Sequence, residues 1–300
     1  MMKKLSYLVL ILATLEVSAQ DTFRLFYLGG QSNMVGYGYN KDLPDSLNRT
    51  FDNVYIYHGN TADDGASDGG IGIWEALKPG HGVGAKATGK ANQLSDRFGL
   101  ELAFADRLQE LYPGEKIALI KYAKGGTSID SLAAGNFGCW EPDFNSKNGI
   151  NQYDHFLTTL KNAFTLQDIN GDGKPDELIP SGILWMQGES DGDKTEAIAL
   201  RYYDHLTRLM NLMRAALRTD DLPVLVGKIT DSMHPNYKGK VWPYGDLIQY
   251  AEEKFVMNDQ NAAIIRNTKY YGASDPWHYL SADYIDFGKA FADQYYQLTK

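Results

Sequence analysis

Short apolar runs alternate along the chain with segments whose apolar residues repeat at helical spacing. This alternation constrains the fold more than any other feature. The helical stripes cover residues 100–111, 156–164 and 198–217, and a last one follows Ser281. Strands alternating with helices predict a mostly parallel sheet of about five strands between two helical layers, an α/β/α sandwich, because parallel strands need long crossover connections. The runs assigned to strands are residues 23–28, 54–57, 117–122, 182–186 and 224–229.

The first 19 residues differ in character from the rest of the chain. Lys3 and Lys4 precede an apolar run, residues 5–15, and small residues follow at positions 17–19. This order predicts a secretory signal peptide. The run is too short for a membrane anchor, which takes about 20 apolar residues. No repeat or linker is visible beyond it. We therefore expect one domain, residues 20–300, in a secreted or periplasmic protein.

Charge and cysteine content exclude several classes of function. The formal net charge of −9 disfavours nucleic acid as a partner, and no basic stripe is visible. We expect no membrane partner either. Cys139 is the only cysteine in the sequence, which excludes an internal disulfide and a paired-cysteine metal site. No His/Asp cluster has the spacing of an open catalytic metal site, so we expect no cofactor for catalysis.

Polar and glycine-rich segments follow three of the predicted strands, and ligands bind at these ends in open parallel sheets. The stretch GGQSNMVG places Ser32 in a turn after the first strand. KGGTSI follows the third strand and WMQGESD follows the fourth. Asp275 and His278 lie three residues apart, just before the last helix. We expect one cleft to gather all four segments.

Ser32, His278 and Asp275 are the residue types of an acyl-transfer triad. A serine hydroxyl is a weak nucleophile until a base takes its proton, and a carboxylate holds that base in the required tautomer. The reaction also needs donors for the oxyanion of the tetrahedral intermediate. We expect these to be the backbone N–H groups of Ser32 and Gly126 and the side-chain amide of Gln187.

The segments GGQSNMVGYG, KGGTSI, WMQGESD and DPWHY resemble, in this order, the blocks of the SGNH (GDSL-like) hydrolases. They are most similar to the branch that holds carbohydrate esterase family six acetylxylan esterases and sialate O-acetylesterase-like proteins. The resemblance runs from about residue 23 to the last helix. It implies a flavodoxin-like α/β/α sandwich, with Ser32 as nucleophile, His278 as general base and Asp275 as its orienting acid.

The same resemblance bears on the oxyanion donors. It places a donor at Gly126 in preference to Gly125. Gln187 stands where the wider superfamily has an Asn, and its longer side chain leaves its direction open.

Two further residues are expected to support the site. Glu189 has two interpretations: it orients His278 in place of Asp275, or it ties its loop to neighbouring backbone N–H groups. We favour the second, because Asp275 already has triad spacing to His278. Asn33, beside the nucleophile, is the other supporting residue.

The stretch DINGDGKPDE has the pattern of a calcium loop, with Gly173 at the sharp turn. Ile179 occupies the position of the usual bidentate Glu. Two interpretations stay open: a structural calcium site, or an acidic turn without an ion. The candidate calcium ligands are Asp168, Asn170, Asp172 and Asp176.

These features together predict a secreted serine esterase that removes O-acetyl groups from carbohydrate. Acetylated plant polysaccharide such as xylan is the first choice of substrate, and sialic acid O-acetyl groups are the second. A non-catalytic carbohydrate-binding protein on the same fold is the alternative from another class, and the complete triad argues against it. A calcium-stabilised adhesion module is disfavoured because the calcium-type loop is not repeated.

Overall fold

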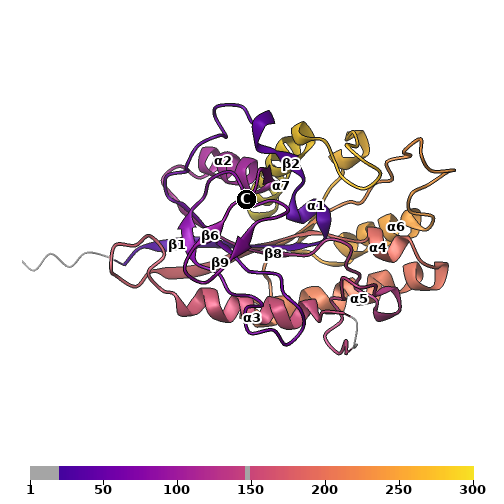
Figure 1. Cartoon of the computed structure of the whole chain (residues 1–300), viewed down its shortest axis with the longest axis horizontal. Helices are drawn as coiled ribbons and strands as arrows, with labels where there is room; N and C mark the ends of the chain where they lie inside the picture. The colour runs from indigo at the N-terminus through magenta and orange to yellow at the C-terminus, as the bar shows by residue number, and fades with distance from the viewer. Residues whose placement is uncertain (1–19, 146–148) are drawn as a thin grey trace, which may run out of the picture.

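The computed structural model describes residues 20–145 and 149–300 (Figure 1). The predicted signal peptide, residues 1–19, lies outside the described residues. Among those residues, the central sheet has the order β11-β10-β9-β1-β8-β3-β4, and its strands are parallel except for β4, which pairs antiparallel with β3. Its seven strands are β1 (Thr22–Gly30), β3 (Val54–His58), β4 (Trp74–Ala76), β8 (Lys116–Ala123), β9 (Glu177–Met186), β10 (Val224–Gly227) and β11 (Ala262–Ile265).

The predicted fold class and the five predicted strands are confirmed, but the sheet has two more strands than expected. Both additions are short strands at the edges of the sheet. β4 has three half-buried residues, and β11 has only four, so neither makes a long apolar run. Two small antiparallel ribbons lie outside this sheet: β2 (Gly38–Tyr39) with β7 (Arg97–Phe98), and β5 (Lys86–Ala87) with β6 (Asn92–Gln93).

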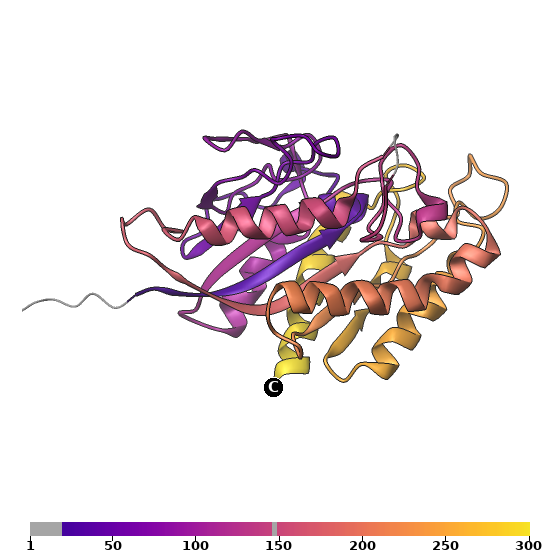
Figure 2. The same cartoon turned by 90° about the horizontal axis from the view of Figure 1, so that it is seen from below.

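Helices cover both faces of the sheet (Figure 1). Helices α2 (Glu101–Leu111) and α7 (Ser281–Thr299) pack together on one face, and α3 (Gln152–Thr165) and α5 (Glu196–Ala216) lie across the other (Figure 2). Helix α6 (Gly245–Asn258), which the sequence did not predict, packs against α5 and β11. The remaining short helices are α1 (Ser32–Val35), α4 (Glu189–Gly192), η1 (Asn40–Asp42), η2 (Ser131–Ala133) and η3 (Asn267–Tyr270).

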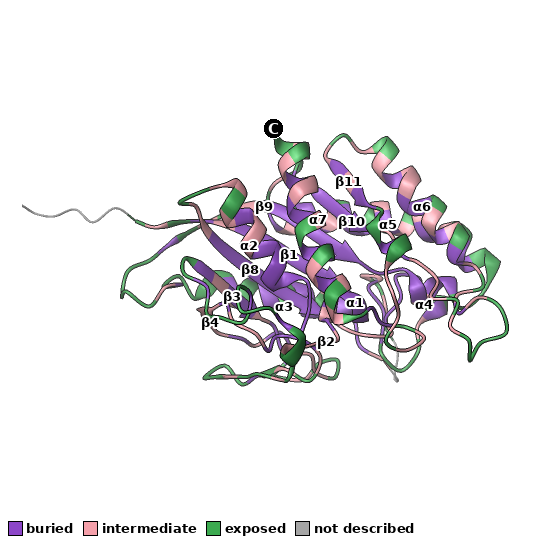
Figure 3. Ribbon diagram, turned by 90° about the horizontal axis from the view of Figure 1, so that it is seen from above, coloured by how far each residue is buried: buried purple, intermediate pink, exposed green. Residues whose placement is uncertain are grey.

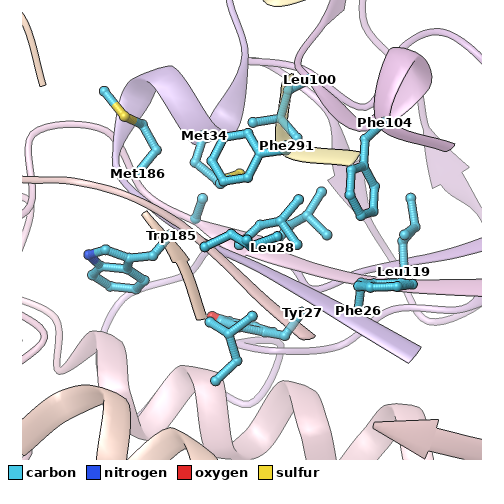
Figure 4. Packing of buried hydrophobic residues seen from close by; sticks show 14 of the residues in the cluster. Phe26, Tyr27, Leu28, Met34, Leu100, Phe104, Leu119, Trp185, Met186 and Phe291 are labelled. Carbon is cyan, nitrogen blue, oxygen red and sulfur yellow. The ribbon is translucent and has the colours of Figure 1, made fainter. Parts of the chain in front are cut away.

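The central strands form the core, as Figure 3 shows by their burial. β1, β8 and β9 are buried on both faces, which explains why the sequence of each contains a continuous apolar run. Met34 anchors the short helix α1 in this core as a fully buried member of the cluster, part of which Figure 4 shows. None of the described helices is long and apolar enough to cross a lipid bilayer.

The close approach of α7 to α2 depends on Gly288. A Cβ atom at this position would lie 2.4 Å from the backbone oxygen of Leu100 and 2.7 Å from the backbone nitrogen of Phe104. We predict that Gly288→Ala lowers the free energy of unfolding by about 2 kcal/mol, the usual cost of overpacking. Urea denaturation measures this change. The exposed Lys289→Ala is the control, and we expect it to stay within about 0.5 kcal/mol of wild type. Equal stability of the two variants would contradict the packing argument.

Candidate active site

The carboxyl ends of three central strands meet at one point. Gly30, the last residue of β1, pairs with Ala123 of β8 on one side and with Met186 of β9 on the other. Gly30 has a φ of +138°, and a Cβ atom there would lie 2.0 Å from the Met186 carbonyl oxygen. The chain therefore turns at a glycine, and Gln31 continues the contact by donating its N–H to the same carbonyl at 2.8 Å. Three of the segments expected to form the cleft start from this point.

Ser32 is the first residue of α1 and is 6% exposed. Gly125 lies directly against it, because a Cβ atom on Gly125 would be 3.3 Å from the Ser32 Cβ. The atoms nearest to the Cβ position of Gly126 belong instead to the ring of Phe137. Among the described residues, no acceptor binds the backbone N–H of Ser32, Gly125 or Gly126. The nucleophile segment and the loop after β8 thus offer three backbone N–H groups without an acceptor among the described residues.

Asp275 and His278 are in direct contact. His278 Nδ1 lies 2.7 Å from Asp275 Oδ2, and Asp275 Oδ1 accepts the backbone N–H groups of Trp277 at 2.8 Å and His278 at 2.9 Å. Burial raises the pKa of Asp275, but the hydrogen bonds from His278 and Trp277 outweigh it and hold that pKa below its usual value. Burial lowers the pKa of His278, although Asp275 opposes the shift. The downward shift favours the uncharged imidazole, which is the form that accepts a proton.

Asn33 connects the nucleophile segment to the histidine segment. Its Nδ2 donates to the carbonyl oxygen of Trp277 at 3.1 Å, and its Oδ1 accepts the Tyr284 hydroxyl at 2.8 Å. Asn33 follows Ser32 in sequence and Trp277 precedes His278, so this bond places the two loops side by side. The structure thus brings together the segments that carry the predicted triad.

Glu189, the first residue of α4, is 2% exposed. Its Oε1 accepts a hydrogen bond of 2.9 Å from Asn33 Nδ2, and its Oε2 has no partner among the described residues. Burial raises its pKa to about 7, against the effect of the Asn33 bond. The carboxylate on His278 Nδ1 is Asp275, not Glu189. Glu189 ties its loop to a side chain of the nucleophile segment, where we expected backbone N–H groups.

The Gln187 side chain does not point its amide at an incoming oxyanion, so this part of the prediction is corrected. The residue is fully buried. Its Nε2 lies within hydrogen-bonding distance of three protein acceptors, which use both of its hydrogens. Its Oε1 accepts the Tyr202 hydroxyl at 2.9 Å. The three acceptors are Asp191 Oδ2 at 2.7 Å, the Thr127 carbonyl at 3.0 Å and Gln31 Oε1 at 3.2 Å.

Asp191 holds the loop that follows β8, a role that the sequence did not reveal. Its carboxylate accepts the backbone N–H groups of Ile129 at 3.0 Å and Asp130 at 2.9 Å, besides the Gln187 amide. Burial raises its pKa to about 6 despite these bonds. The only signal in the sequence was its place after the fourth predicted strand.

Tyr37 is a second residue that sequence reasoning missed. Its ring lies flat on the imidazole of His278, with ring centroids 3.5 Å apart and an interplanar angle of 7°. The stretch VGYGY, an aromatic residue between two glycines just after the nucleophile, was the available signal.

The calcium-type loop forms a tight turn. Asp168 accepts the backbone N–H groups of Gly171 at 2.8 Å and Gly173 at 3.0 Å, and Asp176 Oδ2 accepts that of Ile169 at 2.8 Å. Among the described residues, no group of three or more His, Cys, Asp or Glu side chains is arranged to hold a metal ion. A calcium ion at this loop stays a prediction.

Comparison with known proteins identifies the family. The model of the SASA family, described as carbohydrate esterase, sialic acid-specific acetylesterase, matches residues 22–297. The chain belongs to this family. It is therefore an ester hydrolase of the carbohydrate acetylesterase type, in the sialate O-acetylesterase-like branch that the sequence blocks resemble. No curated protein gives a significant match to the whole sequence.

Solved structures share the fold at low sequence identity. A protein from Arabidopsis thaliana is 20% identical with a TM-score of 0.63, and the match covers 93% of this chain and 99% of that one. NanS is 16% identical with a TM-score of 0.60, and the match covers 94% and 99% of the two chains. A carbohydrate acetylesterase from Xanthomonas citri is also 16% identical, with a TM-score of 0.57 over 90% of this chain and 55% of that one.

The burial of Glu189 predicts a pH-dependent cost in stability. Between pH 4.5 and 7 the unfolded chain has released the proton of this carboxyl and the folded chain retains it, so stability falls as the pH rises. We predict that the free energy of unfolding of Glu189→Gln, relative to that of wild type, is about 3 kcal/mol higher at pH 7.5 than at pH 4.5. Urea denaturation at both pH values measures it. The exposed Glu196→Gln is the control. A gap between Glu189→Gln and wild type that does not change with pH would contradict the argument.

Proposed function

We propose that this carbohydrate acetylesterase works through a Ser32–His278–Asp275 triad and an acetyl-enzyme. The observation that carries the proposal is the 2.7 Å contact of His278 with Asp275, on a loop that Asn33 ties to the nucleophile segment. Acyl transfer requires a nucleophile, a base, a carboxylate that orients the base, and donors for the oxyanion. Ser32, His278 and Asp275 supply the first three, the pKa of the base is lowered, and backbone N–H groups without an acceptor supply the donors.

The steps follow from these groups. His278 Nε2 takes the proton of Ser32 Oγ, which attacks the acetyl carbonyl carbon. The backbone N–H groups of Ser32 and Gly126, with that of Gly125 beside them, bind the oxyanion of the tetrahedral intermediate. The intermediate collapses, and His278 gives its proton to the departing sugar oxygen. Water, activated by the same imidazole, then attacks the acetyl-enzyme and releases acetate.

Two substrate classes fit this chemistry. We propose O-acetyl groups of a neutral plant polysaccharide such as xylan as the first. The second is the O-acetyl group of sialic acid, which the description of the matching family favours. Release of acetate from acetylated xylan and from O-acetylated sialic acid, compared at equal enzyme concentration, distinguishes the two. We also propose that residues 1–19 direct the protein out of the cytoplasm, on the basis of their sequence pattern.

Replacement of the nucleophile tests the mechanism directly. We predict that Ser32→Ala lowers kcat for 4-nitrophenyl acetate by a factor on the order of 10⁴, because triad members act as a unit. Ser46→Ala, at an exposed serine in another loop, is the matched control and keeps wild-type kcat. Comparable activity of Ser32→Ala and Ser46→Ala would rule out Ser32 as the nucleophile.

The pH dependence tests the base. We predict that kcat/KM rises with pH through one ionisation, at a pH below the ordinary histidine value of about 6.5, because burial lowers the pKa of His278. Asp275→Asn removes the negative charge that raises this pKa. The midpoint then moves to lower pH while kcat falls by about 10³-fold or more. A midpoint that moves to higher pH in this variant would contradict the assigned role of Asp275.

A further inference from the structure

The ring of Tyr37 covers the imidazole of His278 in an unusual geometry. Two neutral aromatic rings prefer an offset or edge-to-face arrangement, because their quadrupoles repel in a direct sandwich. A centroid distance of 3.5 Å at 7° leaves almost no room for an offset, since carbon atoms in contact are about 3.5 Å apart. A cation, in contrast, is attracted to the face of a ring. The arrangement suits the imidazolium that forms when His278 takes a proton.

The hydroxyl of Tyr37 lies beside the nucleophile. A Cβ atom built on Gly125 would be 3.3 Å from Ser32 Cβ and 3.7 Å from Tyr37 Oη, so the three groups surround one small volume. No partner among the described residues hydrogen-bonds with Tyr37 Oη, and the side chain is partly exposed. This phenol is thus free to donate to a substrate oxygen bound next to Ser32 and Gly125.

The backbone around Tyr37 is held firmly in place. Arg97 donates to the Tyr37 carbonyl oxygen at 2.8 Å. Just before it, Gly36 has a φ of +96°, and a Cβ atom there would lie 2.3 Å from the Cα of Gly99, the residue that follows β7. The position of the ring is therefore set by the fold.

Two charged groups act on the imidazole that Tyr37 covers. Asp275, on the same loop, stabilises the imidazolium, and Arg97, from β7, opposes it. Arg97 also stacks on the ring of Tyr39, with its guanidinium carbon 3.4 Å from the centroid. Asp275 has the larger effect of the two on this pKa. The face of the Tyr37 ring lies against the same imidazole, where attraction between a cation and a ring face would add to the effect of Asp275.

We propose that Tyr37 is a catalytic residue with two actions: its ring face stabilises the imidazolium of His278, and its hydroxyl donates a hydrogen bond to the oxyanion of the acetyl group on Ser32. This inference rests on the proposed triad. It adds a side-chain donor to the oxyanion site, a role that we assigned to Gln187 from the sequence and that the structure does not support.

The two actions are separated by two variants assayed with 4-nitrophenyl acetate. Tyr37→Phe keeps the ring and loses the hydroxyl. We expect kcat to fall by about 10²-fold, the usual effect of losing one oxyanion donor, with KM and the pH midpoint of kcat/KM unchanged. Tyr37→Leu loses both, so kcat falls further and the midpoint moves to lower pH. Tyr39→Phe, which removes the hydroxyl of the neighbouring tyrosine, is the control and keeps wild-type kcat.

Each part of the proposal has its own contrary result. Wild-type kcat in Tyr37→Phe would overturn the role of the hydroxyl. An unchanged pH midpoint in Tyr37→Leu would overturn the role of the ring.

If Tyr37→Leu does not fold, 3,5-difluorophenylalanine at position 37 replaces it, because fluorine weakens the attraction of the ring face for a cation. The midpoint then moves to lower pH relative to Tyr37→Phe, and an equal midpoint would again overturn the role of the ring. Activity of Ser32→Ala would instead show that the proposed function itself is wrong.

Discussion

The register of three parallel strands determines where the chemistry of this protein takes place. Gly30 lies between Ala123 and Met186, so β1, β8 and β9 end together. Side chains just past these ends cannot be far apart, whatever loops follow. The absence of a side chain at Gly30 lets the backbone turn against the Met186 carbonyl and start α1 at Ser32. One steric constraint thus positions the nucleophile and the loops around it.

Buried polar side chains then hold these loops to one another. A buried donor or acceptor without a partner is costly, so each such group selects one loop arrangement. Asn33 joins the nucleophile helix to the loop of His278, and Asp191 joins the loop after β8 to α4. Glu189 has one partnered oxygen and one unpartnered oxygen, so its hydrogen bond from Asn33 does not offset burial, which raises its pKa to about 7. Through these hydrogen bonds the loops around the site are joined into one network.

The fold was predictable because its central strands are buried on both faces, which leaves continuous apolar runs in the sequence. Asp275 and His278 could be paired because the contact is local. Gln187 was assigned wrongly, since a sequence does not show which way an amide points, and its neighbours turned out to be protein acceptors. Tyr37 was missed for a related reason. Its contact with His278 joins residues that are far apart in the sequence, and no periodicity or motif predicts such a contact.

The most direct test of the account is to find which residue a serine-directed organophosphate modifies. Diethyl 4-nitrophenyl phosphate reacts with a serine that a neighbouring base activates, and peptide mass spectrometry locates the adduct. We predict one phosphoryl group, on Ser32, that does not form in His278→Ala because the base is missing. An adduct on a different residue, or none on an enzyme that hydrolyses acetate esters, would contradict the claim that Ser32 and His278 form the reacting pair.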